Sequence, residues 1–285
     1  MIDYKFIFKI ILIIIAFVIL FPISHFFLSI RPIKFYTPTT PKDYNLEYEN
    51  VSFVTSDKIK ISAWLITSKT ANTTVIAGHG YPFNKGNILP VIKFLHPNYN
   101  LLLYDHRYFG ESKGFITTVG LKEIKDVEAA IKFIQDKFPK KQIALFGFSL
   151  SASAMLMSKA NVSAIIVDSP YANLENIIKN IYSIFGPLKY PMTFVTNTLS
   201  LIFFKTHPKK VAPELSVRDL NIPIFLIHGE KDIQFPVENA YAIKKNNPKH
   251  IELWIVPNAN HGESYFLAKN EYEKLVKTFL NKHVK

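Results

Sequence analysis

The sequence predicts an α/β fold built on a mostly parallel, doubly wound sheet of eight strands. Two observations predict it. Eight short runs rich in apolar, β-branched and aromatic residues recur along the chain, most of them continuously apolar, as in strands buried on both faces. Segments with helical periodicity lie between several of these runs, and alternation of strand and helix is typical of a parallel sheet with helices on both faces.

The eight runs follow one another from residue 46 to residue 258. The first two are predicted to form an opening strand pair, and the others to be buried strands. In chain order the expected strands are Leu46–Thr55, Lys60–Ile66, Thr73–Gly80, Asn100–Arg107, Gln142–Phe148, Ser163–Pro170, Pro223–Glu230 and Ile251–Asn258.

Two segments show clear helical periodicity, residues 120–138 and 263–283. The core-facing positions expected in the first are Leu121, Ile124, Val127, Ile131 and Ile134. Residues 174–214 break the alternation, because they have no strand pattern but hold many apolar residues, including Phe185 and Phe194. This interval is too long for a plain crossover helix, so we expect a small helical lid over the strand ends.

Residues 1–30 are predicted to be an N-terminal membrane anchor. The segment Ile10–Ile30 has no formally charged residue, and about 20 helical residues match a hydrocarbon core of about 30 Å. The apolar region of a cleaved signal peptide is only about 7 to 15 residues long and ends in small residues. Lysines or arginine flank the segment on both sides, so the side of the membrane that holds the rest of the chain stays open.

The segment between the anchor and the first strand, residues 31–45, is predicted to be a tether. It carries prolines at positions 32, 38 and 41 among threonines, a composition that extends the backbone and resists helix. The remaining residues, 46–285, are long and apolar enough for one main domain, with 174–214 inserted as the lid.

The amino-acid composition excludes several kinds of catalytic chemistry and makes some binding partners less plausible than others. The chain has no cysteine, which excludes disulfides, thiolate nucleophiles and cysteine-ligated zinc. Its formal net charge of +12 would suit nucleic acid or anionic lipid. The lysines are scattered instead of forming one basic run with interleaved aromatics, so we expect no nucleic-acid partner.

Ser149 is the candidate nucleophile. It lies in "GFSLS", where a predicted strand turns into a helix, and such an elbow needs small residues two positions before and after the nucleophile. Gly147 and Ser151 meet that need, although Ser151 departs from the second glycine of G-x-S-x-G. Ser151 and Ser153 are expected in the first turns of the helix.

A serine hydroxyl needs a base, and the base needs an orienting carboxylate. Asp232 follows the seventh expected strand and His261 follows the eighth, which gives the chain order serine, aspartate, histidine. Asp168, at the end of the sixth strand, is the alternative acid. The three groups are expected to meet because the carboxyl ends of parallel strands share one edge of a sheet.

The same edge should supply donors for an oxyanion. One expected donor is the backbone N–H of Leu150, directly after the nucleophile, and the other is that of Tyr81, in the loop after the third strand. His79 and His228, which also end strands, are expected to brace loops.

Taken in order, the motifs HGY, DHRYFGES, GFS, HGEKDIQFP and NANHGES resemble the α/β-hydrolase superfamily over roughly Leu46–His283. With the anchor and the short lid, the chain is more closely similar to membrane-anchored YqkD-type hydrolases, near relatives of the serine aminopeptidase-like group. The resemblance implies the same five site residues, and it makes Asp105 and Arg107 structural. Tyr108 stands where these relatives commonly have glycine.

The expected activity is that of a serine hydrolase that needs no cofactor or metal and cleaves carboxylic ester or thioester bonds through an acyl-enzyme. An apolar lid beside a membrane anchor suggests a small acyl substrate. Such a substrate would be derived from lipid and would reach the site from the bilayer. Two alternatives stay open: a serine peptidase or aminopeptidase of the same fold, and a non-catalytic membrane-tethered binding protein. Carbon–halogen or epoxide cleavage would need an aspartate at position 149 and is disfavoured.

Overall fold

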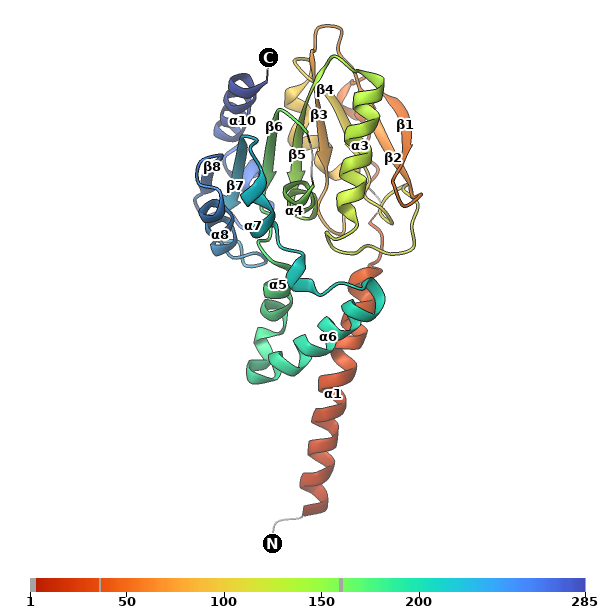
Figure 1. Ribbon diagram of the computed structural model, residues 1–285, viewed down its shortest axis with the longest axis vertical. Helices are drawn as coiled ribbons and strands as arrows, with labels where there is room; N and C mark the ends of the chain where they lie inside the picture. The colour runs from red at the N-terminus through yellow and green to blue at the C-terminus, as the bar shows by residue number, and fades with distance from the viewer. Residues whose placement is uncertain (1–3, 36, 159–160, 285) are drawn as a thin grey trace. The chain divides into compact units, whose positions relative to one another are not determined.

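The computed structural model describes residues 4–35, 37–158 and 161–284, which divide into two compact units (Figure 1). The first, named here the helical unit, comprises residues 4–32 and 173–212. The second, named here the sheet unit, comprises the described residues of 33–172 and 213–284. Each unit is described below by itself.

The sheet unit is built on one eight-stranded mixed sheet, which confirms the predicted fold class. The strand order is β1-β2-β4-β3-β5-β6-β7-β8; β1 and β2 pair antiparallel, β2 is antiparallel to β4, and all other pairs are parallel. The strands are β1 (Glu49–Val54), β2 (Lys60–Ile66), β3 (Thr73–Gly78), β4 (Asn100–Tyr104), β5 (Gln142–Phe148), β6 (Ala164–Asp168), β7 (Ile224–Gly229) and β8 (Ile251–Val256).

The parallel register brings the loops that carry the predicted site to one edge of the sheet. Gly78 at the end of β3 pairs with Gly147 of β5, and Phe148 of β5 pairs with Asp168 at the end of β6. The chain therefore leaves these three strands side by side, as the sequence predicts from the rule for parallel sheets.

Helices cover both faces of the sheet. On one face the core includes side chains of α3 (Glu123–Lys137), α4 (Leu150–Met157) and α8 (Glu238–Asn246), and on the other those of α2 (Lys85–Ile92) and α10 (Lys269–His283) (Figure 1). The shorter elements of the sheet unit are η1 (Pro41–Tyr44), η2 (Lys93–Leu95), α7 (Pro213–Ser216), η5 (Val217–Asp219) and α9 (Ser264–Leu267).

The two periodic segments are helical with shifted bounds. Helix α3 starts at Glu123, after Gly120 with a φ of 115°, so Leu121 precedes the helix and Ile124 is half-buried. The other predicted core residues of α3 are Val127, Ile131 and Ile134, and all three are buried. The expected C-terminal helix is two helices, α9 and α10, separated at Ala268.

The segment expected as a tether belongs partly to the sheet unit. The Asn84 amide donates a hydrogen bond to the carbonyl oxygen of Phe35 at 3.0 Å, and the hydroxyl of Thr37 donates to the side-chain oxygen of Asn87 at 2.8 Å. Residues 41–44 form a 3₁₀ turn, because Asp43 accepts the backbone N–H of Thr40 at 2.7 Å and fixes its first turn. The prolines of this segment disfavour a long helix, but they are compatible with a short turn that packs against the sheet unit.

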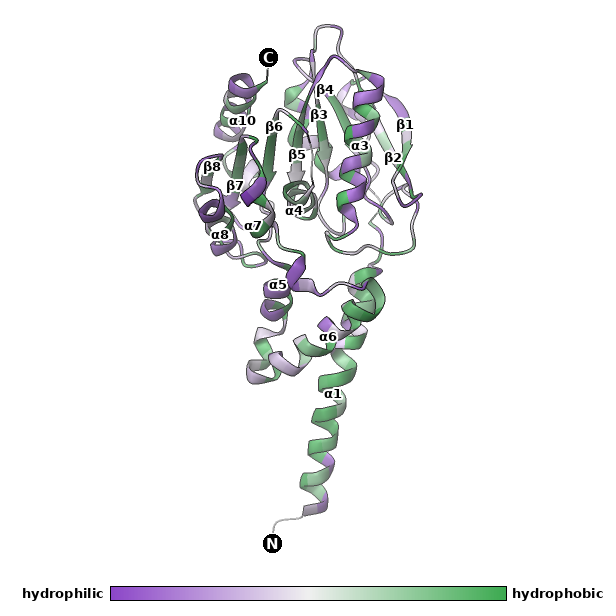
Figure 2. Ribbon diagram, in the orientation of Figure 1, coloured by the Kyte–Doolittle hydropathy of each residue, from purple (hydrophilic) through white to green (hydrophobic). Residues whose placement is uncertain are grey.

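The helical unit is all-helical, as the sequence predicts for the insertion. It consists of α1 (Tyr4–Ile30), α5 (Leu174–Ile181), η3 (Tyr182–Leu188), α6 (Lys189–Phe204) and η4 (Pro208–Lys210). Helix α1 is long and apolar enough to cross a membrane, with a mean hydropathy of 3.1 over its best 18 residues, and Figure 2 colours it as hydrophobic along most of its length. It is therefore a candidate membrane anchor.

Candidate active site

Ser149 sits on a strained turn between β5 and α4. Its φ is 53° and its ψ is −106°, a conformation that residues with a side chain rarely adopt. The turn is held by its backbone N–H, which donates to the carbonyl oxygen of Asp168 at 2.8 Å. Gly147 is needed for the tightness of the turn, because a Cβ there would lie 2.7 Å from the backbone nitrogen of Ala152. Ser149 is thus presented as the elbow motif predicts.

The structure brings Ser149, His261 and Asp232 together. His261 Nε2 lies 3.0 Å from Ser149 Oγ, and His261 Nδ1 lies 2.7 Å from Asp232 Oδ2. An ionised carboxylate only accepts hydrogen bonds, so this geometry places the imidazole proton on Nδ1 and leaves Nε2 to accept from the serine hydroxyl. The rings of Phe235 and Phe148 flank the imidazole, with centroids 4.8 and 5.2 Å away.

The Asp232 carboxylate is itself fixed by its own loop. Its Oδ1 accepts the backbone N–H groups of Gln234 at 3.0 Å and Phe235 at 2.7 Å. Buried His228 donates from Nε2 to the carbonyl oxygen of Phe235 at 2.7 Å, and burial lowers the pKa of this histidine. His228 therefore braces the acid's loop, as the sequence suggested.

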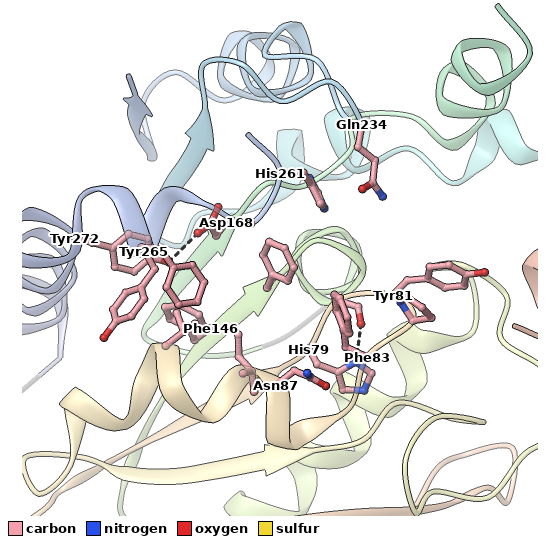
Figure 3. A pocket seen from close by; sticks show the side chains of 17 residues that line it. His79, Tyr81, Phe83, Asn87, Phe146, Asp168, Gln234, His261, Tyr265 and Tyr272 are labelled. Atoms are coloured by element: carbon pink, nitrogen blue, oxygen red, sulfur yellow. Dashed lines mark hydrogen bonds between the residues drawn. The ribbon is translucent and has the colours of Figure 1, made fainter. Parts of the chain in front are cut away.

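Asp168, the alternative acid, has other partners. Its carboxyl accepts hydrogen bonds from the hydroxyls of Tyr272 and Ser169, each at 2.9 Å, while Asp232 holds the imidazole. Burial raises the pKa of Asp168 to about 6. Asp168 instead contributes to the wall of a cavity (Figure 3).

The two expected oxyanion donors lie beside the elbow with their N–H groups unused. Among the described residues, no group accepts a hydrogen bond from the backbone N–H of Tyr81 or of Leu150. Leu150 is the first residue of α4, where a backbone N–H has no partner within the helix. Both donors are therefore available to an external anion.

A buried network that sequence reasoning missed supports the Tyr81 loop from behind. The hydroxyl of Ser151 donates to the carbonyl oxygen of His79 at 2.7 Å and lies 2.6 Å from His106 Nε2. His106 Nδ1 lies 3.2 Å from Asp126, and the backbone N–H of His106 donates to His79 Nε2 at 3.0 Å.

Ser151, His106 and Asp126 are buried, and they have the same residue types as Ser149, His261 and Asp232. Burial lowers the pKa of His79 well below its usual range, so its imidazole is neutral and can accept at Nε2. One signal was present in the sequence: Asp126 falls on the same helical stripe as Val127 and Ala130, which face the core.

The loop of Asp105 and Arg107 is structural, in keeping with the resemblance. The Asp105 carboxylate accepts a hydrogen bond from the ammonium of buried Lys85 at 2.6 Å, and Arg107 forms a salt bridge with Asp126 at 2.8 Å. Tyr108 takes the left-handed conformation that glycine would favour, with a φ of 73°. The loop keeps its shape with a tyrosine there because the backbone N–H of Tyr108 is held by the carbonyl oxygen of Lys113 at 2.9 Å.

A cavity of about 560 Å³ opens beside His261 within the sheet unit (Figure 3). Its volume is in the range of small-molecule sites, roughly 300 to 1,000 Å³. Its wall is mostly aromatic and aliphatic, and includes Tyr81, Phe83, Ile88, Phe146, Phe148 and Tyr265. The arrangement can hold an apolar group next to the Ser149 hydroxyl and two unused N–H donors.

No family model matches the sequence. Among curated proteins, YqkD of Bacillus subtilis is 28% identical over 222 residues, which cover 74% of this chain and 72% of YqkD. The Saccharomyces cerevisiae membrane protein YNL320W is 24% identical over 151 residues, covering 50% of this chain and 52% of its own. The yeast protein carries the word membrane in its name.

Among solved structures, the Pyrococcus furiosus esterase Pf2001 superimposes with a TM-score of 0.76 at 29% identity. The match covers 90% of this chain and 99% of that esterase. Motif order, sheet topology and these similarities together place the chain in the α/β-hydrolase superfamily, with YqkD among its relatives.

Proposed function

We propose that this protein is a serine hydrolase that cleaves carboxylic ester or thioester bonds through an acyl-enzyme. The observation that carries the proposal is the continuous hydrogen-bonded series from Ser149 through His261 to Asp232, at 3.0 and 2.7 Å. It lies beside an apolar cavity and two unused backbone N–H groups. The likeness to a structure described as an esterase supports the same activity.

In the first half of the proposed reaction, Ser149 Oγ attacks the acyl carbon while its proton passes to His261 Nε2. The backbone N–H groups of Tyr81 and Leu150 would stabilise the oxyanion that forms, and removal of one such donor typically lowers the rate by about 10² to 10³. Asp232 stabilises the imidazolium. The imidazolium then gives its proton to the leaving oxygen or sulfur as the bond from the acyl carbon breaks.

In the second half, water replaces the leaving group. His261 takes a proton from the water, the resulting hydroxide attacks the acyl carbon, and the bond to Ser149 Oγ breaks as that oxygen regains the proton. Apart from the substrate and water, every step uses groups of this chain, so the proposed route calls for no cofactor.

We further propose that α1 anchors the protein to a membrane as a single N-terminal span, and that the acyl substrate is lipid-derived. The length and hydropathy of α1 support the anchor, as does the description of the yeast relative as a membrane protein. The aromatic cavity supports an apolar acyl group.

The test is labelling with a fluorophosphonate, which reacts with an activated serine. We expect the wild type to be labelled, Ser149→Ala to be unlabelled, and the matched control Ser158→Ala, at the end of the same helix, to be labelled normally. A folded wild type that resists the probe would favour the non-catalytic binding protein. Unlabelled wild type should hydrolyse p-nitrophenyl acyl esters, and prior reaction with the probe should abolish this activity; turnover of peptides alone would support the peptidase alternative.

A further inference from the structure

The helical unit exposes more apolar surface than its own packing covers. Ile184 in η3 is 82% exposed, and Phe194 and Ile202 in α6 are 71% and 65% exposed. Other large apolar side chains of the same segment are exposed too, namely Ile181, Leu188, Tyr190, Leu201 and Phe203. Clustered exposed apolar residues of this kind mark an interaction surface.

This surface continues from the candidate anchor. Helix α1 packs against the insertion through aromatic rings, with Phe27 and Phe203 centroids 5.3 Å apart and Phe21 and Phe185 centroids also 5.3 Å apart. Phe17, further toward the N-terminus of α1, lies 5.5 Å from Phe185. Figure 2 shows the hydrophobic colour on both α1 and much of α6.

The position of these contacts along α1 decides what surrounds the insertion. At 1.5 Å per residue, Phe17 lies about 20 Å from the end of the helix at Ile30. A hydrocarbon core is about 30 Å thick, so a span formed by residues 10–30 holds Phe17 and Phe21 inside it. A side chain that packs on both, as Phe185 does, lies at membrane depth as well.

The charges of the insertion fit the same surroundings. From residue 180 to residue 213 the sequence contains four lysines and no aspartate or glutamate: Lys189, Lys205, Lys209 and Lys210. The one carboxylate of the insertion, Glu175, pairs with Lys179 at 3.3 Å, and none of the four lysines pairs with a carboxylate among the described residues. Lysines beside an apolar helix are typical of elements that lie in a membrane interface, where they attract anionic lipid headgroups.

We propose that the insertion, residues 173–212, is embedded in one leaflet of a bilayer that contains anionic lipid. Helix α6 and η3 enter the apolar layer beside α1, and Lys205, Lys209 and Lys210, which follow the end of α6, lie at the headgroups. This inference rests on the proposed anchor but does not need the proposed hydrolase activity. The insertion is thereby a second membrane-binding element and not a freely moving cover in water.

The absence of cysteine from the chain permits a direct test. Single variants of the full-length protein, Ile184→Cys and Phe194→Cys, would carry a bimane label after reconstitution into vesicles of phosphatidylcholine and phosphatidylglycerol. Ile13→Cys in α1 reports the anchor, and Phe115→Cys, an exposed position of the sheet unit, is the matched aqueous control. Quenching by lipid-attached nitroxide is compared with quenching by iodide.

We expect nitroxide to quench positions 13, 184 and 194, and iodide to quench only position 115. Iodide quenching at 184 and 194 with nitroxide quenching at 13 would overturn the proposal and leave the anchor intact. Protection of 184 and 194 from both quenchers would also overturn it, since the sheet unit would then be the occupant. Iodide quenching at 13 would overturn anchor and insertion together, while fluorophosphonate labelling of Ser149 reports the hydrolase separately.

Discussion

At the scale of single residues, the site depends on carboxylates whose surroundings differ. Asp232 accepts two backbone N–H groups and the imidazole of His261. Asp168, 4% exposed, accepts only two neutral hydroxyls, so burial raises its pKa. The first arrangement stabilises a charge and the second penalises it.

Asp168→Asn should therefore change how stability depends on pH. The pKa of Asp168 is about 6 in the folded protein against 3.8 for an aspartate in water, so Asp168 favours folding when protonated, and this contribution is lost as pH rises from 4 through 6. The shift corresponds to about 3 kcal/mol. The Tm of the wild type relative to Asp168→Asn should fall from pH 4 to pH 7, as measured by calorimetry. A constant difference, or an equal trend in the exposed control Asp136→Asn, would contradict the assignment.

The sequence predicted the three side chains of the hydrogen-bonded series because their order along the chain and their places at strand ends are both visible in it. It did not predict the network of Ser151, His106 and Asp126. Those contacts join a helix turn, a loop and a second helix, and they depend on side-chain directions that no spacing rule specifies.

At the scale of elements, strand positions were predicted well and helix starts less well. Continuous apolar runs mark buried strands, whereas a helix starts where its first N–H groups find acceptors. At the start of α3, no side chain of the described residues caps the helix. Instead Glu123, its first residue, holds the preceding loop: it accepts both hydroxyls and one N–H of Thr117 and Thr118, and the N–H of Gly120, at 2.7 to 2.9 Å. Burial alone would raise the pKa of Glu123, but these hydrogen bonds lower it.

Glu123→Gln should destabilise the protein by about 2 to 3 kcal/mol at pH 7, because an amide cannot accept all four donors. Since the pKa of Glu123 is lowered on folding, its contribution is present above the usual pKa of a glutamate and is lost as pH falls below it. The deficit measured by urea unfolding should thus shrink toward pH 3. Glu128→Gln, exposed on the same helix, is the control and should match the wild type. An undiminished deficit at pH 3 would argue against a charge effect.

At the scale of the whole molecule, the chain combines an apolar helix long enough to cross a membrane with a formal net charge of +12. The sequence predicted the anchor and the helical insertion from length and hydropathy. It could not predict that the two pack together, because the ring pairs join residues more than 150 positions apart.

Charges placed in α1 should release the protein from membranes. Leu12→Asp with Ile15→Asp puts two carboxylates at exposed positions of the helix, each costing about 2.5 to 3.5 kcal/mol at the centre of a bilayer. We expect the wild type to stay in the membrane pellet after alkaline carbonate extraction and the double variant to move to the supernatant. The control, Val54→Asp with Phe115→Asp on the sheet unit, should remain in the pellet. Release of wild type and control alike would mean that α1 does not span a membrane.

Ser151, in α4, packs directly against Gly78 at the end of β3. A Cβ on Gly78 would collide with the Ser151 side chain and lie 2.7 Å from the hydroxyl of Tyr104. The space between positions 78 and 151 holds only one small side chain. The residue at one position therefore limits the size of the residue that the other position can accept during evolution. In a family alignment we expect them to covary: chains with glycine at position 151 and phenylalanine or a smaller residue at position 104 should accept alanine at position 78, and chains with serine at 151 should keep glycine at 78.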